Sequence, residues 1–332
     1  MSQGKGVLVF GELAGGQVSS VTTELLGAGR CLANDLGEDL AAVFLGHSLG
    51  NAPAEAAAWG ADKVYVVDSP LLEPYQSDPF VAAMEQVCQQ VQPNILLVGQ
   101  TTAGRTLAPR LAFRLGTGLA MDCVELAIDK ASRAMLATRP VYGGNARAVY
   151  SCPKTRPQMA TVRAKAMTPL AKDASRKGEI TALSVKLDAS VVKAKVVQRV
   201  REEAAGVKLE DAEVVISGGR GIGGPEGFKQ LEDLAKTLKG AVGATRAACD
   251  AGWVPSTVQI GLTGKIVSPN LYIAVALSGS SQHMAGCSGS KAIVAINKDP
   301  EANIFKEARF GVVGDYKQVL PAFTQKVKAL QG

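Results

Sequence analysis

Short apolar runs alternate with longer amphipathic stretches over the first 115 residues of the chain. The apolar runs predict strands at Gly6–Phe10, Leu40–Leu45, Lys63–Val67 and Asn94–Val98. The amphipathic stretches predict helices at about 20–36, 52–59, 79–91 and 103–115. Such a repeated strand–helix unit is typical of a mostly parallel sheet covered by helices on both faces.

The pattern changes after about Val124, where short segments alternate polar and apolar residues. These segments are Val124–Ile128, Ala134–Thr138, Ala146–Tyr150 and Met159–Ala164, with a turn signal at Gly143-Gly144-Asn145. They predict antiparallel strands added to the first domain, which we therefore expect to contain a mixed sheet.

After Glu210 the strand–helix alternation resumes. Strands are predicted at Ala212–Ser217, Ala241–Ala244, Leu271–Leu277, Ala292–Ile296 and Phe310–Val313, and helices at Glu226–Leu238 and from about Tyr316. The 332 residues fit two domains of ordinary size, and we place the boundary near residue 204. We expect an α/β protein with a mixed α/β domain over 1–203 and a Rossmann-like parallel-sheet domain over 204–332.

Composition excludes several classes of protein. Hydrophobic residues make up 47% of the chain, which argues against disorder, and no apolar run approaches the roughly 18 residues that span a bilayer. No secretion signal precedes the first predicted strand. The six cysteines are scattered without a C-x-x-C pair and the chain has two histidines, so the sequence favours reduced thiols in a cytoplasmic protein over a zinc site.

Positive charge is concentrated in residues 154–208, which carry 13 Lys or Arg against 5 Asp or Glu. Nucleic-acid binding is not favoured, because the segment has no aromatic residue for base stacking and no helix-turn-helix or RNA-binding signature. Two interpretations remain, namely a solvated connector with Val191–Val197 as a half-exposed strand, and a basic surface that faces a partner protein.

The segment Gly46-His47-Ser48-Leu49-Gly50 matches G-x-S-x-G and lies between a predicted strand and a predicted helix. A serine hydrolase would need a histidine base outside this segment, and the remaining histidine is His283. We therefore interpret Gly46 and Gly50 as ordinary turn glycines.

A second glycine-rich segment, Gly219–Gly224, matches G-x-G-x-x-G directly after a predicted strand and opens a predicted helix. Glycines allow close approach to a phosphate, free N–H groups at the helix start point at it, and Arg220 adds a positive charge. The segment departs from the nicotinamide-dinucleotide fingerprint, because no acidic residue ends a strand about 20 residues later and Asp250 is farther along.

Polar residues follow the other strands of the second domain. They are Thr245-Arg246, Ser278–His283, Asn297–Asp299 and Gly314-Asp315. Because the carboxyl ends of parallel strands share one edge of a sheet, we expect these loops to surround one extended nucleotide. Taken separately, Arg246 could form an ion pair on a helix surface and His283 could be a satisfied core histidine.

Four segments of the second domain closely resemble the α-subunit of electron-transfer flavoproteins. They are Gly243–Gly252, Gly261–Pro269, Leu271–Gly286 and Ala292–Pro300. Gly104–Leu111, Arg139–Arg147 and Arg156–Arg163 support the resemblance in the first domain. It implies a heterodimer with a β-subunit, one FAD held mainly by residues 204–332 as the FAD-binding domain, and AMP or a second FAD in the β-subunit.

The resemblance also implies roles for individual residues. The pyrophosphate and ribityl contacts fall on Arg220, Thr245, Ser278, Gly279, Ser280, Ser281, Gln282 and His283, and the adenosine end falls near Asn297, Asp315 and Tyr316. The flavin loop falls on Ile260, Gly261, Leu262 and Thr263, with the Thr263 hydroxyl at the flavin N5. Leu262 departs from the family, which often has Gln there.

Arg246 and His283 would lie beside the flavin ring according to the same resemblance. Both would favour a negatively charged reduced flavin, His283 through a hydrogen bond toward the N1/C2 carbonyl region. The flavin itself would carry the electrons, and no side chain would act as a catalytic acid or base.

The family leaves two activities open. One is an electron shuttle between acyl-CoA dehydrogenases and a quinone-linked oxidoreductase, and the other is bifurcation of electrons from NADH to ferredoxin and a second acceptor. We expect the first domain and the basic segment to dock partners, without membrane insertion. Outside the family, a nucleotide-binding regulatory module without a redox role remains the alternative.

Overall fold

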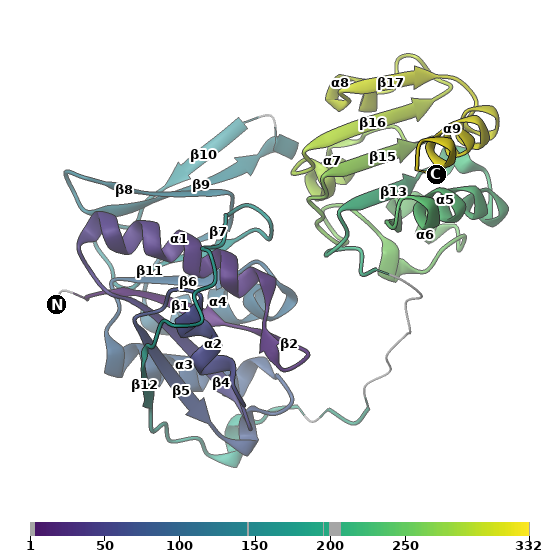
Figure 1. Ribbon diagram of the computed structural model, residues 1–332. Helices are drawn as coiled ribbons and strands as arrows, with labels where there is room; N and C mark the ends of the chain where they lie inside the picture. The colour runs from purple at the N-terminus through teal and green to yellow at the C-terminus, as the bar shows by residue number, and fades with distance from the viewer. Residues whose placement is uncertain (1–3, 145, 195, 199–206, 332) are drawn as a thin grey trace. The chain divides into compact units, whose positions relative to one another are not determined.

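The computed structural model describes residues 4–144, 146–194, 196–198 and 207–331. The chain divides into two compact units, Met1–Val141 with Arg147–Arg199, and Tyr142–Ala146 with Val200–Gly332. The boundary predicted at 203/204 lies outside the described residues. Each unit is built from strands and helices in alternation, as Figure 1 shows, and both are α/β structures with a parallel sheet.

The first unit contains a seven-stranded sheet with the order β12-β5-β4-β1-β6-β11-β7. Its strands are β1 (Val7–Gly11), β4 (Leu40–Gly46), β5 (Lys63–Asp68), β6 (Ile95–Gly99), β7 (Leu119–Cys123), β11 (Gln158–Val162) and β12 (Glu179–Ala182). All neighbouring strands in it run parallel. Fully buried runs such as those of β1 and β6 are typical of strands covered on both faces.

Helices cover both faces of this sheet. They are α1 (Ser20–Leu36), α2 (Ala52–Ala58), α3 (Ser77–Val91) and α4 (Thr102–Leu115). Side chains of α1 and α2 share one core cluster with Val7 and Val9, and those of α3 and α4 share another with Leu8 and Phe10. This division follows from β1 itself, whose successive side chains point to opposite faces.

The antiparallel segments of the first unit differ in part from the expectation. Strands β8 (Glu125–Asp129), β9 (Ala134–Val141) and β10 (Ala146–Tyr150) form a separate three-stranded sheet, in which β8 and β9 pair antiparallel. The expectation of an added antiparallel strand at Met159–Ala164 was wrong, because β11 runs parallel to both β6 and β7. All five of its residues are buried, so it is a central strand.

Three further features of the first unit were not predicted. The sequence pattern did not predict strands β7 and β12. It also did not predict the small hairpin that joins β2 (Leu13–Ala14) to β3 (Gln17–Val18). The proposed strand at Val191–Val197 is absent from its described residues, where Ala189–Val191 is a short 3-10 helix and 192–194 and 196–198 are irregular. No helix of the described chain is long and apolar enough to cross a membrane.

The second unit is a five-stranded parallel sheet with the order β14-β13-β15-β16-β17. Its strands are β13 (Val214–Gly218), β14 (Ala241–Ala244), β15 (Leu271–Val275), β16 (Ala292–Asn297) and β17 (Phe310–Val313). The chain leaves β13 toward β14 on one side and later returns to β15 on the other. The strand order therefore reverses between β13 and β15, where ligands bind in open α/β sheets.

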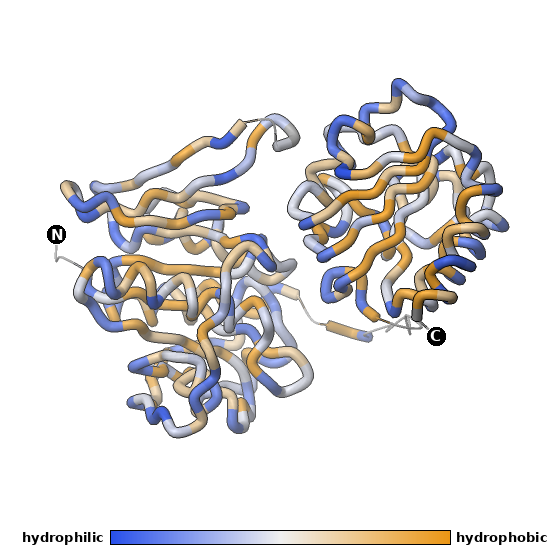
Figure 2. The backbone as a smooth tube through the Cα atoms, turned by 45° about the horizontal axis from the view of Figure 1, so that its top comes forward, coloured by the Kyte–Doolittle hydropathy of each residue, from blue (hydrophilic) through white to orange (hydrophobic). Residues whose placement is uncertain are grey.

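Helices also cover both faces of the second sheet. They are α5 (Pro225–Thr237), α6 (Arg246–Asp250), α7 (Ser281–Cys287), α8 (Ile304–Glu307) and α9 (Tyr316–Gln331). Residues of α5 and α9 form one core cluster with the sheet, and residues of α7 and α8 contribute to the other. Figure 2 shows hydrophobic residues concentrated along the central strands, consistent with two buried faces.

A partly buried carboxyl group lies where the strand order of the first sheet reverses, between β1 and β6. Glu12 follows β1, and its two carboxylate oxygens lie 2.8 and 2.9 Å from the hydroxyl of Thr101, the residue that caps α4. Burial raises the pKa of Glu12 to about 7, although the hydrogen bond from Thr101 opposes the rise. The folded chain therefore binds this proton more tightly than the unfolded chain does.

Glu12→Gln should remove one pH-dependent part of the stability. The pKa of Glu12 rises from 4.5 to about 7 on folding, so its stabilising contribution is complete below about pH 4.5 and is lost as the pH rises to 7. The free energy of unfolding of the variant, relative to that of the parent, should therefore rise by on the order of 3 kcal/mol from pH 4 to pH 8. Chemical denaturation followed by circular dichroism measures this, with the exposed Glu232→Gln as the control. The same difference in stability between variant and parent at pH 4 and at pH 8 would contradict this prediction.

Candidate functional site

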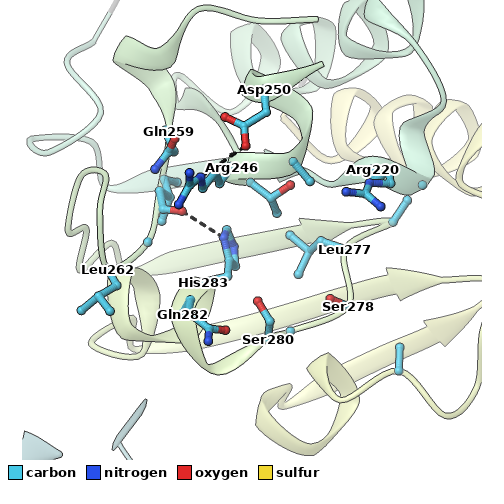
Figure 3. A pocket seen from close by; sticks show the side chains of 18 of the residues that line it. Arg220, Arg246, Asp250, Gln259, Leu262, Leu277, Ser278, Ser280, Gln282 and His283 are labelled. Carbon is cyan, nitrogen blue, oxygen red and sulfur yellow. Dashed lines mark hydrogen bonds and ion pairs between the residues drawn. The ribbon is translucent and has the colours of Figure 1, made fainter. Parts of the chain in front are cut away.

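A cavity of about 720 Å³ opens at the carboxyl ends of the strands in the second unit. Its walls come from the loops after β13, β14, β15 and β16 and from the segment 259–263. In Figure 3, Gln259 and Leu262 lie toward one end and Arg220 toward the other, with Arg246 and His283 between them. The volume is in the range of pockets that hold small molecules and cofactors.

Thirteen of the sixteen predicted site residues line this cavity. They are Arg220, Thr245, Arg246, Ile260, Gly261, Leu262, Thr263, Ser278, Gly279, Ser280, Gln282, His283 and Asn297. The structure therefore brings together residues that are separated by as many as 77 positions in the chain. This gathering results from the parallel sheet, which places all the contributing strand ends at one edge.

The other three predicted residues, Ser281, Asp315 and Tyr316, are not among those that line the cavity. Tyr316 is buried and its hydroxyl donates a hydrogen bond to the carbonyl of Ile222 at 2.7 Å. The Asp315 carboxylate accepts from the backbone N–H of Lys317 at 2.9 Å, at the start of α9. These contacts give Asp315 and Tyr316 structural roles, and their proposed proximity to an adenosine remains a prediction.

The glycine-rich loop after β13 packs tightly against the loop after β15. A Cβ atom on Gly219 would lie 2.5 Å from the carbonyl oxygen of Ala276, and one on Gly221 would lie 2.8 Å from it. Both distances are too short for a real side chain, so these two positions require glycine. The glycine spacing alone indicates close approach to a phosphate, whereas the structure shows that packing between the two loops already requires these glycines.

A buried hydroxyl without a partner marks the wall beside β14. Thr245 Oγ1 is buried, and no described residue makes a hydrogen bond to it. Thr245 precedes α6, yet its side chain makes no capping hydrogen bond to that helix. A buried polar atom without a partner is costly, and a ligand with phosphate or hydroxyl oxygens would satisfy it. The cavity therefore fits the polar, extended part of an FAD molecule.

Arg246 begins α6 and is held by a residue that sequence reasoning had not assigned to the site. Its Nε atom lies 3.2 Å from Oδ2 of Asp250, and both side chains line the cavity. Because this ion pair uses Nε, it leaves the two terminal nitrogens of the guanidinium available for another acceptor. The four-residue spacing along α6 was the available sequence signal for this pair.

His283 is held from behind the cavity wall by two protein groups. Its Nδ1 lies 3.1 Å from the Ile260 carbonyl and its Nε2 lies 2.8 Å from the hydroxyl of Tyr272. A carbonyl can only accept, so Nδ1 carries the hydrogen and Nε2 accepts from Tyr272. Burial lowers the pKa of His283 to about 4, so the ring is neutral at pH 7.

The geometry of His283 differs from the expectation that it donates a hydrogen bond to a flavin. In this structure both ring nitrogens are used inside the protein, and the side chain is 5% exposed. This geometry matches the alternative of a satisfied core histidine, placed in the wall of the site. The sequence did not identify the partners of the ring, because they come from β15 and from the segment after η5 (Ser256–Val258).

The G-x-S-x-G segment of the first unit has the local shape of a nucleophile elbow but lacks a triad. Ser48 has a positive φ of 57°, and the Asp68 carboxylate contacts both the His47 ring, at 2.9 Å, and the Ser48 N–H, at 3.2 Å. No hydrogen bond joins the Ser48 hydroxyl to His47 within the described chain. Asp68 therefore stabilises a turn.

The described residues include no cluster of His, Cys, Asp or Glu side chains suited to hold a metal ion.

Comparisons with known proteins agree with this organisation. Residues 7–188 match the electron transfer flavoprotein domain, and residues 208–288 match the electron transfer flavoprotein FAD-binding domain. The chain is 44% identical to the electron transfer flavoprotein subunit alpha of Thermoanaerobacterium thermosaccharolyticum, over 100% of both chains. It is 41% identical to the Bacillus subtilis subunit alpha over 98% of both, and 43% identical to the protein FixB of Rhizobium meliloti over 97% of this chain and 92% of FixB.

His283→Gln should reduce the sensitivity of the fold to acid. The pKa of His283 falls from 6.5 to about 4 on folding, so the unfolded chain takes up a proton that the folded chain refuses, and stability is lost as the pH drops from about 6.5 to 4. Glutamine does not titrate, so the variant does not lose stability in this way as the pH drops. Its deficit in stability relative to the parent should shrink by about 2 kcal/mol between pH 7.5 and pH 5, measured by chemical denaturation. A deficit that stays constant would show that His283 titrates normally.

Proposed function

Because the chain belongs to the electron-transfer flavoprotein α-subunit family, we propose that it holds one FAD in the cavity of its second unit and transfers electrons through it. The observation that carries this proposal is the cavity itself, placed where the strand order reverses and containing the partnerless Thr245 hydroxyl. Membership in an α-subunit family implies a β-subunit partner, and the FAD-binding domain match at 208–288 supports the choice of cofactor.

The polar end of the cavity suits the pyrophosphate and ribityl groups of FAD. We assign the phosphate contacts to Arg220, Thr245 and the Ser278–Ser280 loop, which line the cavity and offer one positive charge, hydroxyls and backbone N–H groups. Asn297 lines the same cavity, and its amide donates to the Leu277 carbonyl at 2.9 Å, which orients the side chain toward the adenosine end in this proposal. These contacts bind the cofactor and orient it.

Arg246 is the positive charge that we assign to the flavin ring. The flavin supplies the redox chemistry when bound, and the protein adjusts the charge around it. Since His283 is neutral, Arg246 is the cation at this part of the wall, partly offset by Asp250. A guanidinium beside the ring favours negative charge on the ring.

The identities of the electron donor and acceptor are part of this proposal. We propose either a shuttle between acyl-CoA dehydrogenases and a quinone-linked oxidoreductase, with AMP in the β-subunit, or bifurcation from NADH to ferredoxin, with a second FAD there. Six unpaired cysteines favour a reducing compartment such as the cytoplasm.

We assign docking of these partners to the first unit and the basic segment. Some of the positive charge of that segment is already used within the first unit. Arg163 pairs with Asp122 at 2.7 Å and Lys172 with Glu55 at 2.8 Å. Exposed lysines such as Lys154 and Lys177 remain for a partner surface.

The number of FAD molecules in the purified αβ complex tests the proposal. A flavoprotein is yellow, and one FAD per αβ pair is expected for a shuttle and two for bifurcation. Absorbance and quantified release of FAD measure this number directly. A colourless complex that binds a nucleotide without FAD would instead support the regulatory module.

Arg246→Ala should lower the reduction potential of the bound FAD. A hydrogen bond or contact to a charged group is worth about 1.5–3 kcal/mol, and exposure reduces this value. Since the Arg246 side chain is 69% exposed, we expect a decrease on the order of 60 mV for a one-electron step. Arg246→Lys should recover part of it, because lysine keeps the charge without the planar fork.

Stepwise reductive titration against a reference dye measures the potential in these variants. Arg309→Ala is a suitable control, because Arg309 lies over the ring of Phe310 and does not line the cavity. FAD should stay bound in all three variants, since the loops assigned to the phosphates are unchanged. An unaltered potential in Arg246→Ala with FAD retained would remove Arg246 from this role.

A further inference from the structure

The segment Gln259–Lys265 forms one wall of the cavity, and its backbone is tied to two other elements. The N–H of Ile260 donates to the carbonyl of Ala244, the last residue of β14, at 2.9 Å. The N–H of Leu262 donates to the carbonyl of Gln282 in α7 at 2.8 Å. The position of the segment is therefore fixed from both sides.

The tip of this segment is a closed turn. The N–H of Lys265 donates to the Gln259 carbonyl at 2.7 Å, and the N–H of Gly264 donates to the Gly261 carbonyl at 3.0 Å. A Cβ atom on Gly264 would lie only 2.4 Å from the Gln259 carbonyl oxygen, so the turn closes tightly. Thr263 lies in this turn, and the main freedom left to it is rotation of its side chain and hydroxyl.

A single side chain restricts that rotation. The Nε2 atom of Gln259 lies 3.0 Å from the Thr263 hydroxyl oxygen. An amide nitrogen only donates, whereas a hydroxyl both accepts and donates. The Thr263 hydroxyl therefore accepts from Gln259 and keeps its own hydrogen for another acceptor. Both residues line the cavity and Thr263 is exposed, so that hydrogen is free to point into the cavity.

The neighbouring residue offers no substitute for this contact. Leu262 is 61% exposed and has no polar side-chain atom. Among the hydrogen bonds of the described chain, the Gln259 amide is the side-chain partner of Thr263. The orientation of this hydroxyl depends on Gln259 in particular.

We propose that Gln259 is a positioning residue that directs the hydroxyl hydrogen of Thr263 into the cavity, where it donates a hydrogen bond to the flavin ring. This inference rests on the proposed function, because it takes the flavin end of FAD to lie against the 259–265 turn. Gln259 does not itself contact the reacting atoms. Its effect on the flavin passes through Thr263.

A double-mutant cycle with Gln259→Glu and Thr263→Val tests the proposal in the αβ complex. A carboxylate only accepts hydrogen bonds, so Gln259→Glu makes the Thr263 hydroxyl donate to it and turns the hydrogen away from the cavity. We expect the equilibrium between oxidised and one-electron-reduced bound FAD to shift about tenfold toward the oxidised form, because a donated hydrogen bond favours the negative charge of the one-electron-reduced ring. The shift is measured by reductive titration against a reference dye.

The cycle separates orientation from added charge. The new carboxylate acts on the flavin in both backgrounds, whereas the change in hydroxyl direction exists only when Thr263 is present. With Thr263→Val as the background, the shift caused by Gln259→Glu should therefore be at least threefold smaller, roughly the worth of a neutral hydrogen bond. Equal shifts in the two backgrounds would overturn the proposal.

Two further variants complete the design. Gln259→Met releases the hydroxyl without adding charge and should shift the equilibrium about threefold in the same direction, again only when Thr263 is present. If the Gln259→Glu complex does not retain FAD, the Gln259→Met variant tests the proposal in its place. Gln282→Glu adds the same charge at another cavity-lining amide without a side-chain contact to Thr263. Its effect should be the same in both backgrounds.

FAD binding by the parent complex separates a failure of this inference from a failure of the proposed function. A parent complex that binds no FAD would refute the proposed function. A parent complex that binds FAD, together with additive effects of the Gln259 and Thr263 substitutions, would refute only the role of Gln259. Additive effects would mean that the two side chains act on the flavin independently.

Discussion

The close packing of two loops above β13 and β15 determines the shape of the site in the second unit. The strand order reverses between these strands, so the connections on the two sides diverge and leave an opening. Gly219 and Gly221 then bring the first loop against the Ala276 carbonyl, which is possible only without side chains. The remaining loops surround the opening from β14 and β16. A larger residue at either glycine would disturb this arrangement at its centre.

The polar groups around the opening are divided between structural and ligand-directed roles. His283 directs its nitrogens to Tyr272 and the Ile260 carbonyl, and so connects α7 to the turn that carries Thr263. Thr245, by contrast, has a buried hydroxyl without a protein partner. The polar atoms of His283 are thus satisfied within the protein, whereas the Thr245 hydroxyl, in a residue that lines the cavity, is not.

Much of this architecture could be predicted from the sequence, because strand ends and the polar residues after them are local features. Thr245 and Ser278 were found in this way. Gln259 was not, since it follows a short 3-10 helix and its role depends on a turn closed by tertiary contacts. The direction of β11 was also missed, because an alternating pattern does not encode whether a strand pairs parallel or antiparallel. The hydrogen-bond partners of His283 likewise depend on packing between distant segments.

The late position of β11 in the chain has a consequence for biosynthesis. β11 lies between β6 and β7 in the first sheet, and β12 adds a further edge strand beside β5. The sheet therefore lacks an interior strand until residue 162 has left the ribosome, and it is complete only with residue 182. Until then, the partly synthesised unit exposes apolar strand edges, the kind of surface on which nascent chains aggregate or recruit chaperones. The core of the first unit can therefore close only when about half of the chain has been made.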